Sequence, residues 1–290
     1  MEAIIRSDIF QKALLGGSLT AVLCAAVGYF MVLRALAFAS EALTDIGFAG
    51  ATGSVLLGWN PFVGMFGLGL VAVFSLVALR DRLKGRDVQV GMVLSFALGL
   101  GVLFLSLYAR SSATHASSGV GMLFGSLLSL SNHILNILLV VTLSVLVVLA
   151  VIFRPLLFAS INPGSARAKG VPTGLLDLVY LLLLAAATAV SIQSMGFLLA
   201  FALLSAPAGA AHKLTRRPRL ALLLAVLLGL GVAWASLLLA FFGPLKRIPV
   251  GFFIASLSAL LYGGSLLVNQ LRRQPRPAEH HPHREREIRH

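Results

Sequence analysis

Long apolar runs separated by short polar segments form the dominant pattern of this chain. The runs are continuous and do not alternate with polar residues, which is typical of membrane-spanning helices and not of barrel strands. Crossing the hydrocarbon core of a bilayer takes about 20 such residues. The pattern predicts nine candidate spans, at residues 13–33, 35–58, 61–79, 88–108, 134–153, 174–193, 195–211, 220–242 and 249–268. The run at 120–130 is too short to cross, and we expect a re-entrant or interfacial piece there.

The two ends of the chain are more polar than the region between them. We assign residues 1–12 to a short N-terminal segment, 13–270 to one transmembrane domain and 271–290 to a basic, His-containing tail. The first apolar run is too long for a cleavable signal, so we expect it to stay in place as a helix. The tail has few apolar residues and is expected to be disordered. Its histidines could bind metal weakly, although a tail lying near anionic membrane lipid is the favoured interpretation.

Composition places the chain in the membrane. Hydrophobic residues make up 58% of it and charged residues only 11%, whereas soluble domains carry about 25% charged residues. We therefore predict an all-α, polytopic helical bundle of eight to nine spans in the cell membrane. Gly and Ala are frequent within the runs, which lets helix backbones approach closely and favours tight packing. The single cysteine, Cys24, excludes a disulfide framework.

The positive charges indicate how the bundle is oriented. A net charge of +13 would suggest nucleic acid as the partner of a soluble protein. Here the basic residues cluster in short segments between runs, as membrane orientation requires, so we expect no nucleic-acid partner. The basic segments at 80–87, 153–171 and 212–219, and the tail, are expected in the cytoplasm. Nine spans would then put the N-terminus outside, whereas Arg6 and Lys12 favour inside; eight spans, with one partial segment at the front, would reconcile the two.

Two carboxylates interrupt the second run. Glu41 and Asp45 are four residues apart, so on a helix both project from one face. A carboxylate at a helix centre costs roughly 2.5–3.5 kcal/mol to insert, and ionisable groups at this depth normally mark substrate or ion routes. Their oxygens suit hard divalent cations, and an incomplete ligand shell suits a transit site; a proton relay is the competing function. The structural alternatives are that the pair lies near the interface, or that Arg34 neutralises one of the two.

Enzymatic chemistry has little support in the sequence. The chain contains no HExxH, GxSxG or CxxC motif. A membrane-embedded hydrolase would need acidic or His pairs converging from at least two helices, and only one helix offers such a pair. The phosphate-binding pattern GxxxxGK[ST] is also missing, so if transport consumes ATP, another chain hydrolyses it. We expect no tightly bound cofactor. A cation- or proton-coupled secondary transporter that uses Glu41 or Asp45 is the alternative to an ATP-driven one.

Several blocks, in order along residues 10–268, resemble the permease subunits of the zinc/manganese/iron-type ABC importers. They are YFMVLRALAFASEALTD (29–45), NPF (60–62), LFGSLLSLS (123–131), SINPGSARAKGV (160–171), MGFLLAFALLSAPAGAAHKL (195–214) and RIPVG (247–251). The chain departs from the family pattern in placing Glu41 and Asp45 where the signature has an aspartate and a histidine. Asn162 also precedes the proline where an aspartate is usual, and Lys246 and Arg247 stand where an acidic residue is common.

The resemblance implies a permease of the second importer type, working as a homodimer around a central pathway. Two cytoplasmic ABC ATPase subunits would bind beneath it, and an extracytoplasmic metal-binding protein would deliver manganese, iron or zinc as substrate. Glu41 and Asp45 would form the metal transit site. A short helix within 154–171, ended by Gly170, would dock on the ATPase, and a bulky residue at Ala166 is expected to break this coupling. The coupling residues would be Arg154, Ser165, Ala166, Arg167, Lys169 and Gly170.

Overall fold

The protein is a bundle of long helices. The computed structural model describes residues 7–78, 86–111, 127, 130–215, 217–242 and 250–273, and all regular structure in them is helical. Eight of the helices in this part of the chain are long and apolar enough to cross a membrane: α2 (Asp8–Leu33), α4 (Pro61–Ala78), α5 (Arg86–Ser111), α7 (Asn132–Ile161), α9 (Thr173–Met195), α10 (Phe197–Leu214), α11 (Pro218–Phe242) and α12 (Val250–Arg273). Two further helices are α3 (Ala37–Leu56) and α8 (Pro163–Ala168). The predicted all-α bundle of eight to nine spans is confirmed.

Some expectations fall on residues that the structure does not describe. The expected re-entrant piece at 120–130 lies almost wholly outside the described residues. So do the basic segment before α5, the two basic residues at 246 and 247, and the tail after residue 273. These expectations stay predictions.

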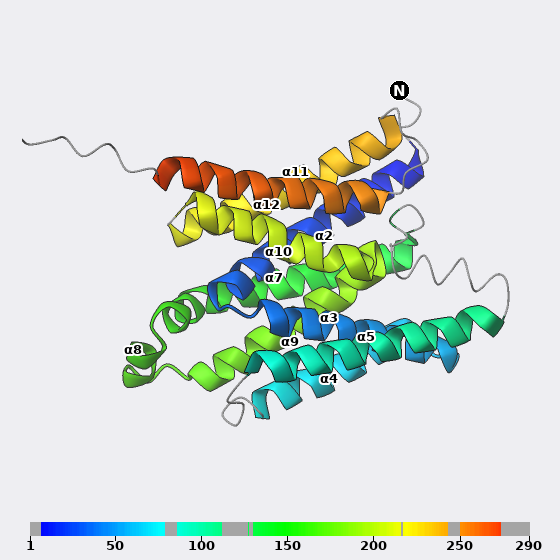
Figure 1. Cartoon of the computed structure of the whole chain (residues 1–290), viewed down its shortest axis with the longest axis horizontal. Helices are drawn as coiled ribbons and strands as arrows, with labels where there is room; N and C mark the ends of the chain where they lie inside the picture. Colours follow the sequence, from blue (N-terminus) through cyan, green and yellow to red (C-terminus); the bar gives the residue numbers. More distant parts are fainter. Residues whose placement is uncertain are drawn as a thin grey trace, which may run out of the picture.

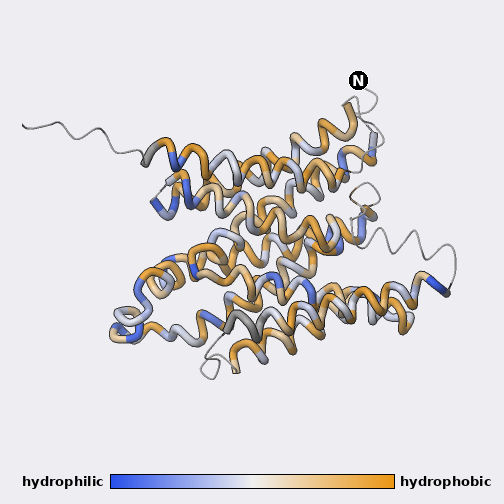
Figure 2. The backbone as a smooth tube through the Cα atoms, viewed as in Figure 1, coloured by the Kyte–Doolittle hydropathy of each residue, from blue (hydrophilic) through white to orange (hydrophobic). Residues whose placement is uncertain are grey.

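Three helices form the centre of the bundle. In the most apolar stretches of α2, α9 and α10, 72%, 67% and 61% of the residues are buried, against 17–22% in α4, α5 and α7. The large side chains that are fully enclosed include Tyr29, Phe30 and Tyr180. Figure 2 shows hydrophobic residues along most of the helix lengths and hydrophilic residues gathered around α8. The outer helices therefore turn apolar faces to the lipid, while α2, α9 and α10 pack inside.

The start of α2 lies at the end of the bundle opposite α8 (Figure 1). Phe10, near that start, makes edge-to-face contacts with Phe241 and Phe242 at the end of α11, with ring centroids 5.0 and 6.3 Å apart. Helix α3 runs away from the α8 end like a spanning helix. If the α8 end is cytoplasmic, as the basic segments predict, α2 starts outside. Helix α3 is not among the eight described helices that are long and apolar enough to cross a membrane, so the count of crossings stays at eight to nine. Lys12, which argued against that orientation, has its Nζ 2.6 Å from the Asp8 carboxylate, so its charge is partly offset.

Glycines bring certain helix backbones into direct contact. A Cβ on Gly28 of α2 would overlap the backbone carbonyl of Leu204 in α10. In the same way, Gly50 of α3 and Gly64 of α4 lie backbone to backbone. Such close approach is available only to residues without a side chain, and it is the usual way in which helices pack inside membranes. It fixes α3, the helix with the two carboxylates, against α4.

Candidate functional site

A sharp elbow between α2 and α3 places the acidic pair. Helix α2 ends with Arg34 as its C-cap, and Ala35 then adopts a left-handed conformation with φ of +52°. The backbone N–H of Leu36 donates to the carbonyl of Met31 at 2.9 Å, which closes the turn. A non-glycine residue in this region is uncommon and is held there by its surroundings. The elbow reverses the chain, so that Glu41 lies just over one helical turn into α3.

Glu41 and Asp45 lie on one face of α3, as predicted. Asp45 is buried, with 5% of its surface exposed, and Glu41 is half-buried. The same face continues along the helix with Phe48 and Thr52, both buried. The two carboxylates are close enough for the charge of Glu41 to repel a negative charge on Asp45. No cluster of three or more His, Cys, Asp or Glu residues occurs in the part of the chain that the structure describes. Within one chain the pair is thus an incomplete ligand set.

Beyond Asp45, toward the end opposite α8, this face of α3 is sealed by apolar packing. Helices α9 and α10 are joined by a single residue, Gly196, whose φ of +92° makes the tight reversal possible. Phe197, the first residue of α10, stacks on Phe48 with ring centroids 4.7 Å apart. Met65, Leu105 and further apolar side chains of α3, α9 and α10 complete this buried cluster. This apolar cluster closes the face of α3 on that side of Asp45.

Arg34 does not neutralise the pair. Its guanidinium forms an ion pair with Asp177, near the start of α9, through Nη2 and Oδ1. Among the described residues, neither Glu41 nor Asp45 takes part in an ion pair. The alternative in which Arg34 cancels one of the two charges is therefore wrong. Asp177 was not among the residues predicted from the sequence, although a lone carboxylate in the apolar run TGLLDLVYLL (173–182) was a visible signal.

The segment predicted to couple to an ATPase protrudes from one end of the bundle as helix α8. Asn162 caps its start by accepting a hydrogen bond from the N–H of Ser165 at 3.1 Å, and Pro163 occupies the first turn. Gly170, with φ of +76°, ends it as predicted. Arg167 and Lys169 are exposed, as are Pro163 and Ala168.

Ala166, in contrast, is fully buried and faces the bundle. A bulky residue there would disturb the packing of α8 itself, so its effect would not isolate docking. The exposed Ala168 is the better position for that test.

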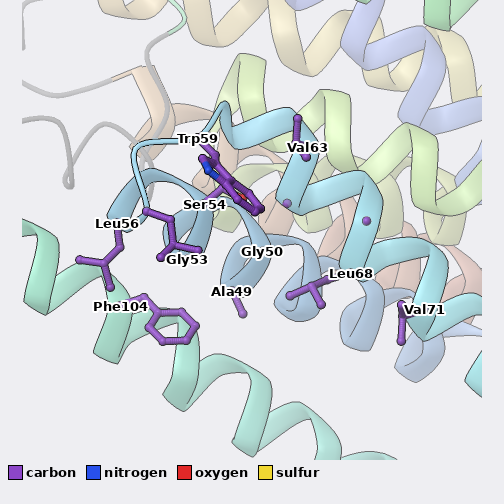
Figure 3. A pocket seen from close by; sticks show the side chains of 13 residues that line it. Ala49, Gly50, Gly53, Ser54, Leu56, Trp59, Val63, Leu68, Val71 and Phe104 are labelled. Carbon is purple, nitrogen blue, oxygen red and sulfur yellow. The ribbon is translucent and has the colours of Figure 1, made fainter.

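One open groove among the described helices contains neither carboxylate. It has a volume of about 710 Å³ and is lined by α3, α4 and α5. Figure 3 shows Trp59, Leu68, Val71 and Phe104 around it, and the lining is almost wholly apolar. Val71 and Trp59 are exposed. An apolar groove of this kind offers a metal ion no ligand.

Helices long enough to span a bilayer, two carboxylates inside the bundle and a capped helix protruding at one end define a polytopic membrane permease. The chain belongs to the ABC 3 transport family, whose profile matches residues 6–269. The resemblance inferred from the sequence blocks is confirmed: the protein is a multi-pass cell-membrane permease of the metal ABC importer type.

Named relatives cover nearly the whole chain. The manganese transport system membrane protein MntC of Halalkalibacterium halodurans is 26% identical over 266 residues, which is 90% of this chain and 87% of the relative. The manganese import system permease protein ScaB of Streptococcus gordonii is 29% identical over 253 residues, which is 87% of this chain and 88% of the relative. In structure, the chain is similar to PsaBC from Streptococcus pneumoniae in complex with Fab, with a TM-score of 0.78, 24% identity and coverage of 91% and 93% of the two chains.

Proposed function

We propose that this chain forms the pathway by which an ABC importer carries a divalent transition metal, manganese in the first place, into the cell. The observation that carries the proposal is the pair Glu41 and Asp45, which lies on one face of a packed helix with no cationic partner among the described residues. Two negative charges close together in a membrane protein are costly unless a cation passes them. The names of relatives such as MntC and ScaB support manganese.

Oxygen ligands agree with this choice of metal. Carboxylates suit manganese and ferrous iron, whereas imidazole and thiolate favour zinc and copper(I). Asp45 stands where the family signature has a histidine, so the site gains oxygen and loses nitrogen. Two side chains leave most of the coordination sphere to water or to a second copy, and a loosely held ion can leave again. The proposed homodimer would place two such pairs along one pathway.

ATP would be hydrolysed by a separate subunit. The chain has no GxxxxGK[ST] loop, while α8 offers a rigid, exposed, basic protrusion at the end of the bundle where the positive charges predict the cytoplasm. An external metal-binding protein would deliver the ion at the opposite end.

The test is uptake of radiolabelled manganese by cells that carry variants of the acidic pair. Replacing Glu41 with Gln and Asp45 with Asn together should reduce uptake at least a hundredfold, because no charge is left to compensate the ion. Asp8→Asn removes an exposed carboxylate of similar size at the far end of α2 and serves as the control. Asp45→His should retain uptake and shift competition toward zinc.

Parental uptake by the doubly neutral variant would show that the carboxylates do not line the route. Uptake that survives a hydrolysis-dead ATPase partner would instead identify a secondary transporter.

A further inference from the structure

A buried ion pair ties the elbow before α3 to the first turns of α9. Arg34 and Asp177 are 143 residues apart in sequence, and only 11% and 10% of their side-chain surfaces are exposed. The other terminal nitrogen of Arg34 is buried and has no hydrogen-bond partner among the described residues. Among the described residues, Arg34 therefore depends on Asp177 for its charge compensation, and removing Asp177 would leave the Arg34 charge buried without it.

Tyr180 strengthens the same junction. Its ring lies under the Arg34 guanidinium, 5.3 Å from the ring centroid to Cζ. Its hydroxyl donates to the backbone carbonyl of Val27 in α2 at 3.0 Å. Asp177 and Tyr180 are three residues apart, so they project from the same face of α9. Helix α9 thus holds the last two turns of α2 through an ion pair, a cation–π contact and a hydrogen bond.

The start of α9 is in turn fixed to α8. The Nε of Arg167 donates to the Thr173 hydroxyl at 3.1 Å, and the N–H of Val171 donates to the carbonyl of Ala166 at 3.0 Å. The Lys169 ammonium lies 5.5 Å from the centroid of the Phe158 ring in α7. Since Ala166 is fully buried, α8 is seated on the bundle and is not free to move alone. A displacement of α8 would carry the first turn of α9 with it.

We propose that Arg34 and Asp177 form a positioning pair that transmits movement of α8 to α3. The connected path runs from Arg167 to Thr173, one helical turn along α9 to Asp177, across to Arg34, and through the elbow at Ala35 into the helix with Glu41. The inference rests on the proposed function, because only an ATPase bound to α8 would give such a path a driving force. An ion pair suits the task because separating two buried opposite charges is costly, so the two helices are held together at this point.

The experiment measures manganese uptake and ATP hydrolysis of the permease purified and reconstituted together with its ATPase, and uses their ratio. In Asp177→Asn, hydrolysis should stay within about twofold of the parental rate while uptake falls at least tenfold. The charge-reversed double variant, Arg34→Asp with Asp177→Arg, should recover a substantial part of the lost uptake, which a loss of folding could not explain. Asp8→Asn, which breaks the exposed ion pair with Lys12 on the same helix α2, is the matched control and should leave the ratio unchanged.

Two results would overturn the inference. One is an unchanged ratio of uptake to hydrolysis in Asp177→Asn, and the other is a loss of both activities in proportion to the amount of folded complex. If Asp177→Asn does not accumulate, Arg34→Lys, which keeps the charge and loses the planar geometry, is measured in the same way and judged by the same ratio. If the parental complex takes up manganese without ATP, the proposed function is wrong. If uptake by the parental complex depends on ATP hydrolysis and the variants show the same ratio of uptake to hydrolysis, only the role of the positioning pair is wrong.

Discussion

The contact between α3 and α4 allows a quantitative test of what fixes the acidic helix. Gly50 and Gly64 meet backbone to backbone, and a Cβ on Gly64 would overlap both the Gly50 carbonyl and the Ser54 hydroxyl. Neither obstacle is the end of a long side chain, so the helices themselves would have to separate. Gly67, one turn further along α4, has open space where its Cβ would be. Gly64→Ala and Gly67→Ala therefore add the same methyl group to the same helix, but only the methyl group at position 64 overlaps atoms of α3.

The expected magnitude follows from that difference. Alanine is more favourable than glycine in a helix by roughly 1 kcal/mol, and both variants share this gain. Forcing extra atoms into a packed contact costs about 1–3 kcal/mol. Gly64→Ala should therefore be less stable than Gly67→Ala by about 1–3 kcal/mol. At roughly 2–4 °C per kcal/mol for a chain of a few hundred residues, its thermal midpoint in detergent should be lower by several degrees.

Function should change in the same direction. Because α4 would push on α3, Gly64→Ala should also reduce manganese uptake, while Gly67→Ala should transport at the parental rate. Thermal unfolding of the purified permease and uptake in cells are both measured for the two variants. A Gly64→Ala protein that melts at or above the temperature of Gly67→Ala would refute the claim that this crossing depends on glycine.

Two further predictions concern partners. Ala168→Trp on the exposed side of α8 should reduce binding of the ATPase, measured by co-purification, and leave the thermal midpoint of the permease unchanged; Ala166→Trp, at the fully buried position, should lower the midpoint as well. The assembly pulled down from native membranes should contain two copies of this chain and two of a Walker-motif ATPase, as determined by its mass. A stable complex with one copy of each would contradict the proposed homodimer.

The apolar runs predicted the helices well and their ends poorly. The run at 61–79 corresponds to α4, Pro61–Ala78, within one residue. The run expected to end at 153 continues as α7 to Ile161, through Arg154 and Pro155. An apolar run ends at the first charged residue, because hydropathy reports which residues can lie in lipid. A helix ends where its backbone hydrogen bonds end. A helix that extends beyond the bilayer can therefore contain both a charge and a proline.

Contacts between distant parts of the chain could not be predicted from spacing. The two carboxylates of the acidic pair could be placed on one face because four residues span about one helical turn. No local pattern pairs Arg34 with Asp177, since partner choice depends on how α2 and α9 pack. The glycine content predicted tight helix packing, but it did not predict which glycines lie at the contacts. Gly28 touches the backbone of α10, while Gly99 and Gly231 face open space. The sequence likewise could not reveal that Ala166 turns inward.

The arrangement around α3 indicates which of its two ends can open. At one end the helix is held by the elbow and, through Arg34, by α9; further along it is held by Gly64 of α4 and by the stacking of Phe48 on Phe197. Stacked aromatic rings separate without leaving a buried charge, whereas separating the ion pair would leave two. The aromatic contact is therefore the less costly one to break, and it is the one that closes the face beyond Asp45. Under the proposed function, α3 would pivot at its elbow and open toward the side from which the metal arrives.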